Sequence, residues 1–259
     1  MRRISFAMAL AGAALAGTAS CGGSSKSEDA QGPNAVDKPL FLIGALDINA
    51  TQCVARADAS VALLPNGILD LTFGSTYTTE LLVENPYAQG TASPTATETE
   101  RVSLRTAEIS LTTSDGTVLG SYSSVGTGAV DAAPIGAAGY GIMAVTLIPA
   151  EVGASDGVQN AHALIAKLRV TGEALNGIAL SSNEIELPIT VCKGCLVRYP
   201  ADAADITVPA GQGYLCTTST VGLVETPAPC ILGQDSPFSC VYCSAEFEVC
   251  RDPQRNPSL

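Results

Sequence analysis

The chain has 259 residues, 46% of them hydrophobic, which excludes disorder over its whole length and allows one large β domain or one domain with an appendage. Its 25 acidic and 13 basic side chains give a formal net charge of −12. This charge argues against nucleic-acid binding, which needs a basic patch. A single His and the absence of Trp argue against His-based catalysis and a His-rich metal site.

Residues 1–20 have the pattern of an export signal, with two arginines, then an Ala- and Leu-rich apolar stretch, then small residues. The stretch is too short for a permanent membrane-spanning helix. Thr18-Ala19-Ser20 before Cys21, followed by a Gly/Ser tract, resembles the lipobox of bacterial lipoproteins, although that family usually has Leu where this chain has Thr18. The resemblance implies cleavage before Cys21 and acylation of that residue. Ordinary cleavage after Ala16, with Cys21 left as a thiol or a disulfide partner, is the alternative.

Residues 21–38 are rich in Gly, Ser, Asp and Asn, a composition that predicts a flexible tether. Residues 39–191 are predicted to be rich in β-strands, because every second residue is apolar in each of several short runs. Such alternation places one face of a strand on a core and the other in water. We therefore expect an all-β domain, an antiparallel immunoglobulin-like β-sandwich of roughly seven to nine strands. The alternating runs lie at 69–73, 77–83, 102–111, 143–147, 164–170 and 185–191.

Breaks in the alternation predict the irregular positions of this domain. The apolar parity slips near Arg105-Thr106, which indicates a β-bulge or a bend. Pro65-Asn66-Gly67 and Asp115-Gly116 lie between apolar runs and are typical of hairpins. Residues 91–99 and 126–139 are predicted to be long exposed loops.

Residues 192–259 hold seven cysteines and almost no alternation, which predicts an irregular, disulfide-rich C-terminal segment. Nine cysteines is an odd number, and lipidation of Cys21 leaves eight, which suits disulfides. Because seven tail cysteines cannot all pair among themselves, we expect Cys53 to pair with one of them, with Cys192 or Cys195 favoured because they follow the last strand. The predicted disulfide cysteines are Cys53, Cys192, Cys195, Cys216, Cys230, Cys240, Cys243 and Cys250.

Two CxxC pairs, Cys192/Cys195 and Cys240/Cys243, have the spacing of zinc ligands. An exported chain meets an oxidising compartment, so disulfides are favoured over a structural metal or a redox CxxC. We therefore expect no metal and no cofactor. His162 lies in an alternating run and is interpreted as a structural or surface residue. No Ser, Cys or acid lies in an activating context, so no catalytic residue is predicted.

The segments at 81–86 (LLVENP) and 182–189 (SNEIELPI), with Cys192-Lys-Gly-Cys195 and the Gly233-Gln234-Asp235 stretch before Cys240, resemble the cysteine-rich lipoproteins of some Gram-negative bacteria. That resemblance implies no activity. It implies a lipid-anchored envelope location, with the outer membrane favoured and a periplasmic or surface-exposed face left open. We expect a non-enzymatic interaction or structural module, held to the membrane by its lipid and able to contact an envelope protein. A lipoprotein that binds a sugar, peptide or metal ion is the alternative, and a hydrolase is less favoured.

Overall fold

The computed structural model describes residues 40–86, 101–132, 138–199, 228–243 and 246–250. It separates the chain into two units, Met1–Asp37 and Lys38–Leu259, and every described residue belongs to the second. The predicted signal sequence, the tether and Cys21 therefore lie outside the described residues, as do Cys216 and the loop at 91–99. Within the described part of the chain, no helix has the length and hydropathy needed to span a bilayer.

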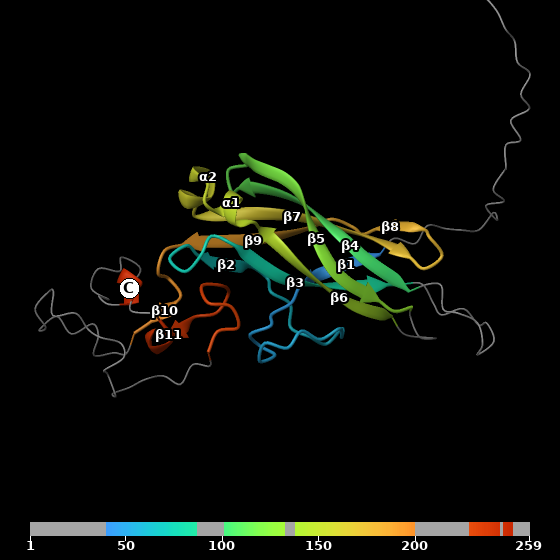
Figure 1. Cartoon of the computed structure of the whole chain (residues 1–259), viewed down its shortest axis with the longest axis horizontal. Helices are drawn as coiled ribbons and strands as arrows, with labels where there is room; N and C mark the ends of the chain where they lie inside the picture. The colour runs from blue at the N-terminus through green and yellow to red at the C-terminus, as the bar shows by residue number, and fades with distance from the viewer. Residues whose placement is uncertain (1–39, 87–100, 133–137, 200–227, 244–245, 251–259) are drawn as a thin grey trace, which may run out of the picture. The chain divides into compact units, whose positions relative to one another are not determined.

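The second unit is all-β, as the alternation predicts, and is built on one nine-stranded sheet. The strand order is β1-β3-β6-β5-β4-β7-β9-β2, and β8 also pairs with β7 (Figure 1). The strands of this sheet are β1 (Phe41–Ala45), β2 (Gly67–Asp70), β3 (Tyr77–Asn85), β4 (Val102–Thr113), β5 (Val118–Val130), β6 (Gly139–Ile148), β7 (Ala163–Ala174), β8 (Ala179–Ser181) and β9 (Ile185–Cys192).

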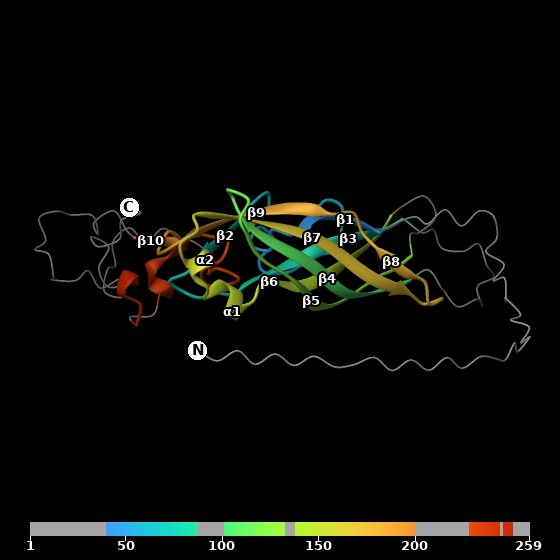
Figure 2. The same ribbon diagram turned by 90° about the horizontal axis from the view of Figure 1, so that it is seen from above.

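Most neighbours in the sheet run antiparallel, whereas β2 runs parallel to β9. The sheet curls until β1 meets the junction between β8 and β9, where Leu40 bridges Ser182 (Figure 2). Next to that bridge, the side-chain amide of Asn183 accepts a hydrogen bond from Leu42 N at 2.8 Å and donates one to Leu42 O at 3.2 Å. The amide thus takes the place of a neighbouring strand and satisfies the edge of β1.

The curled sheet encloses one hydrophobic core of inward-facing strand residues. In β7, Leu164, Leu168 and Val170 are buried, whereas Lys167 and Arg169 on the other parity face solvent. The register of β4 shifts between Leu104 and Thr106 against both of its neighbours, which confirms the predicted bulge. Two four-residue helices, α1 (Ala150–Gly153) and α2 (Asp156–Gln159), connect β6 to β7.

Two sequence expectations about loops are corrected. Residues 126–130 continue β5 rather than opening a loop, because Gly128 lets β5 pass so close to β6 that a Cβ there would strike the carbonyl of Ile142. Pro65-Asn66-Gly67 does not turn a hairpin, since the strand that follows it pairs with β9, far along the chain. The Asp115-Gly116 hairpin is present between β4 and β5, with Gly116 at φ 89°.

The described part of the C-terminal segment packs around a small second core. Here β10 (Val197–Arg198) and β11 (Phe238–Ser239) form a two-stranded parallel sheet, followed by the 3-10 turns η2 (Cys240–Tyr242) and η3 (Glu248–Cys250). Phe238 is fully buried and packs edge-to-face on Phe73, from the turn after β2, with 5.2 Å between ring centroids. Aromatic and cystine side chains therefore share this small core with the buried aliphatic residues Leu196 and Val197.

Candidate functional site

A disulfide between Cys53 and Cys230 fastens the loop after β1 to the C-terminal segment, with the two Cα atoms 5.2 Å apart. Cys53 closes a turn at a φ of 65°, and its N–H donates to Ile48 O at 2.8 Å. The N–H of Cys230 donates to the Asn49 side chain of the same turn at 3.2 Å. The expected bridge from Cys53 to the tail is thus present, but its partner is Cys230 and not Cys192 or Cys195.

Cys192 and Cys195 are joined to one another, which explains why neither reaches Cys53. Cys192 is the last residue of β9, and Gly194 follows at a φ of 76°, a conformation that turns the chain back at once. The two Cα atoms lie 5.9 Å apart. Cys243 pairs with Cys250, and Cys240 is also disulfide-bonded. Every described cysteine therefore takes part in a disulfide.

A fully buried carboxylate, Asp70, holds the Cys192–Cys195 loop through hydrogen bonds. It accepts backbone hydrogen bonds from Thr72 at 3.0 Å, from Gly194 at 2.7 Å and from Leu196 at 3.2 Å. One of its oxygens lies within 4.8 Å of both sulfurs, a grouping that resembles a set of metal ligands. Sulfurs joined in a disulfide offer no thiolate to a metal, so the arrangement fits a structural clamp on the loop.

The C-terminal segment also covers the free edge of β2. Gly233 O accepts from Asp70 N at 2.9 Å, and Asp235 N donates to Ile68 O at 3.1 Å. Asp235 Oδ1 accepts from Ile68 N at 2.8 Å and from the hydroxyl of Tyr77 at 2.7 Å. Burial, with a smaller contribution from the nearby charge of Asp47, raises the pKa of Asp235, against the opposing effect of these two donors.

A cavity of about 490 Å³ lies beside the end of β9 and includes His162, Cys192 and Lys193 in its lining. His162 is exposed, and its carbonyl accepts from Val191 N at 2.9 Å. The amides of Gln159 and Asn160 on the same wall donate to backbone carbonyls of α1 and α2. The position of His162 agrees with the surface role expected for it.

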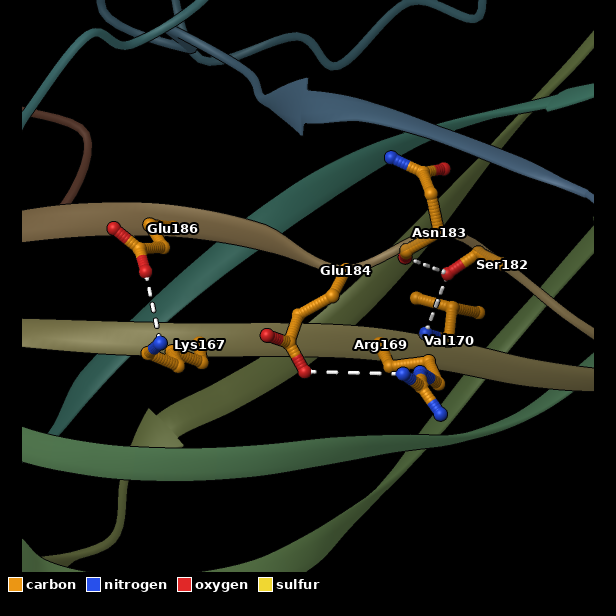
Figure 3. A network of polar contacts seen from close by, with 7 residues as sticks. All are labelled: Lys167, Arg169, Val170, Ser182, Asn183, Glu184 and Glu186. Carbon is orange, nitrogen blue, oxygen red and sulfur yellow. Dashed lines mark hydrogen bonds and ion pairs between the residues drawn. The ribbon is translucent and has the colours of Figure 1, made fainter.

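The outer face of β7 and the start of β9 carries paired charges (Figure 3). Lys167 Nζ lies 2.9 Å from Glu186, and Arg169 lies 3.9 Å from Glu184, all four side chains being largely exposed. Glu184 and Glu186, two residues apart, thus lie on the same solvated face. Figure 3 also shows Asn183 turned towards the blue strand β1 and Ser182 bound to the N–H of Val170 at 2.9 Å. Each of these four charges therefore has an opposite charge beside it on the same face.

A different hollow, which we call the Glu80 groove, lies on the outer face of β3 and β6. It measures about 260 Å³. In Figure 1 the blue loop after β1 and the orange-red segment before β11 lie together below β3, and these two segments supply its apolar wall. The residues that define the groove are Ile48, Thr78, Glu80, Ala144, Thr146 and Ile231, with Val125 on the opposite rim.

No protein-family model matches the sequence, and no curated protein matches it. Among solved structures, the chain is similar to ACE19, the collagen-binding subdomain of the Enterococcus faecalis surface protein ACE. The match covers 48% of this chain and 94% of that one, at 6% identity and a TM-score of 0.18. At this TM-score the likeness supports no statement about function.

The sequence did not single out the Glu80 groove, because its residues come from separate segments of the chain. Glu80 looks like any outward-facing acid of an alternating strand. Its distinguishing neighbours, Ala144 and Ile231, are brought to it by strand pairing and by the Cys53–Cys230 disulfide. No local signal in the sequence indicates either neighbour.

Proposed function

We propose that this chain is a lipid-anchored, non-enzymatic interaction module of a bacterial cell envelope, with Cys21 as the acylated N-terminus. The observation that carries the proposal is that all seven described cysteines are disulfide-bonded. Disulfides at this density persist in oxidising compartments outside the cytosol. The export pattern of residues 1–20 and the lipobox-like sequence before Cys21 support the same location.

A role in binding is supported by how the described carboxylates are used. The buried Asp70 and the largely buried Asp235 are occupied by main-chain and tyrosine donors. A general acid or base needs a free proton-transfer path, which these contacts do not leave. Exposed groups, in contrast, are arranged over extended sheet faces that suit contact with another molecule.

The test of the anchor is the intact mass of the protein purified from membranes. We expect the loss of residues 1–20 and the added mass of acyl chains on Cys21, since more than one chain is needed for stable anchoring. Cys21→Ser should move the protein to the soluble fraction. A Cys21→Ser protein that remains wholly with the membranes contradicts the proposal.

The test of the non-enzymatic role is an assay against esters, peptides and glycosides with the wild-type chain and with His162→Ala. We expect no turnover by either protein. A hydrolytic activity that disappears in His162→Ala would make the protein an enzyme and the proposal wrong.

A further inference from the structure

The floor of the Glu80 groove is made of two cross-strand pairs on the outer face of the sheet. Thr78 of β3 lies opposite Thr146 of β6, and Glu80 lies opposite Ala144. Directly opposed residues of an antiparallel pair share one face. The methyl group of Ala144 is too short to cover its partner, so the carboxylate of Glu80 stands beside an open space flanked by two threonines.

The walls of the groove are apolar and are held in place. Ile48 and Ile231 belong to the two segments that the Cys53–Cys230 disulfide joins, and Ile48 O accepts from Cys53 N. On the other rim, Val125 of β5 is 82% exposed. An aliphatic side chain this exposed at the edge of a hollow gains from contact with an aliphatic group of a ligand.

The carboxylate of Glu80 has no hydrogen bond or ion pair within the described part of the chain. Partial burial raises the pKa of Glu80, because the charged form loses hydration without gaining a partner. A cation entering the groove would therefore meet an unneutralised negative site.

From these contacts we infer that the Glu80 groove receives a lysine or arginine side chain of a partner protein. The aliphatic stem of that side chain lies between Ile48, Ile231 and Val125, and its cationic end reaches the Glu80 carboxylate. The hydroxyls of Thr78 and Thr146 are placed to accept its remaining N–H groups. Long basic side chains combine an apolar stem with a charged head, which matches the order of groups in the groove. This inference rests on the proposed interaction role and names its partner chemistry.

The experiment uses the full mature chain carrying Cys21→Ser, labelled with ¹⁵N, and short blocked peptides that differ only at one central residue. The peptides contain lysine, arginine or norleucine at that position, so that charge is changed while the aliphatic stem is kept. We expect the lysine or the arginine peptide to shift the amide signals of Thr78, Glu80, Ala144 and Thr146, and the norleucine peptide to shift them far less.

Three variants test the Glu80 charge, the open space over Ala144 and, as a control, an acidic residue outside the groove. Glu80→Gln should weaken binding of the basic peptide by roughly twofold to fivefold, the upper part of the range measured for exposed ion pairs. Ala144→Leu should block the groove. Glu84 lies four residues after Glu80 on the same face of β3 but does not line the groove, so Glu84→Gln should leave the affinity unchanged. Because partial burial disfavours the charged form of Glu80 and no partner within the described part of the chain offsets this, Glu80→Gln should melt at or slightly above the wild-type temperature.

Equal binding of the norleucine peptide, full affinity in Glu80→Gln, or no shift of groove amides at tens-of-millimolar peptide overturns the inference. These outcomes are distinct from a failure of the proposed anchor. The intact mass and membrane fractionation of the Glu80→Gln lipoprotein depend on Cys21 alone and are expected to match the wild type.

Discussion

The hydroxyl of Tyr77 donates a hydrogen bond of 2.7 Å to Oδ1 of Asp235, which lies 158 residues later in the chain. Tyr77 is fully buried at the start of β3, and Asp235 belongs to the segment that covers β2. Burial raises the pKa of Tyr77, so its hydroxyl keeps its proton and acts as a donor. This hydrogen bond thus adds to the backbone contacts with β2 that fasten the cysteine-rich segment to the main core.

Removing that donor should destabilise the protein. Tyr77→Phe leaves Asp235 with one donor fewer, and the loss of a hydrogen bond to a charged group costs about 1.5–3 kcal/mol. Tyr140→Phe, in β6, removes a hydroxyl that has no hydrogen-bond partner among the described residues and should cost far less. Urea unfolding of both variants measures the difference, and equal losses would mean that the Tyr77–Asp235 bond contributes nothing.

The raised pKa of Asp235 predicts a pH dependence of stability. The unfolded chain releases this proton near the ordinary value of 3.8, and the folded chain releases it at a higher pH. The stabilising contribution is therefore complete below that value and is lost as pH rises through the folded pKa. Asp235→Asn keeps an oxygen acceptor but cannot ionise. The free-energy difference between wild type and Asp235→Asn should thus shift against the wild type as pH rises from about 4, and a difference that stays flat would contradict this.

Gly67 is required by the position of the Tyr77 ring. A Cβ at residue 67 would overlap the hydroxyl end of that ring, which cannot move without breaking its bond to Asp235. Gly67→Ala should cost about 1–3 kcal/mol, the range for overfilling a packed site. A Cβ at Gly74 meets nothing within 4 Å, so Gly74→Ala is the matched control. Thermal unfolding that shifts equally in both variants would show that the packing argument is wrong.

Much of the fold follows from local pattern. Leu164, Leu168 and Val170 are buried on one face of β7, and the bulge of β4 lies where the apolar alternation changes parity. Both could be predicted because the alternation within a single strand determines which of its faces is buried. The pairing of strands that are distant in the chain produces no such pattern in the sequence. The parallel contact of β2 with β9 could not be read from period, since alternation says which face is buried and not which strand lies alongside.

Disulfide pairing and the groove show the same limit. Counting the cysteines predicts that Cys53 bonds to a tail cysteine. The choice of Cys230 depends on the turn that ends at Cys53, in which the Asn49 side chain accepts a hydrogen bond from Cys230 N. Cys192 and Cys195 cannot pair with Cys53 because the turn at Gly194 joins them to one another. The Glu80 groove depends on both the Cys53–Cys230 link and the pairing of Glu80 with Ala144.

The Cys53–Cys230 disulfide should therefore have a larger effect than any other described bridge. It joins residues 177 apart, against 3 for Cys192–Cys195 and 7 for Cys243–Cys250. In the chain-entropy model a loop of that length contributes about 5 kcal/mol, and the three-residue loop about 2 kcal/mol. The double variant Cys53→Ser/Cys230→Ser should lower the free energy of unfolding by more than Cys192→Ser/Cys195→Ser does. It should also weaken binding of a basic peptide to the Glu80 groove, because Ile48 and Ile231 lose the bond that holds them together. Urea unfolding and the peptide titration measure the two effects. A Cys53→Ser/Cys230→Ser protein with the stability and the peptide affinity of the wild type would show that this bridge holds neither the tail nor the groove wall.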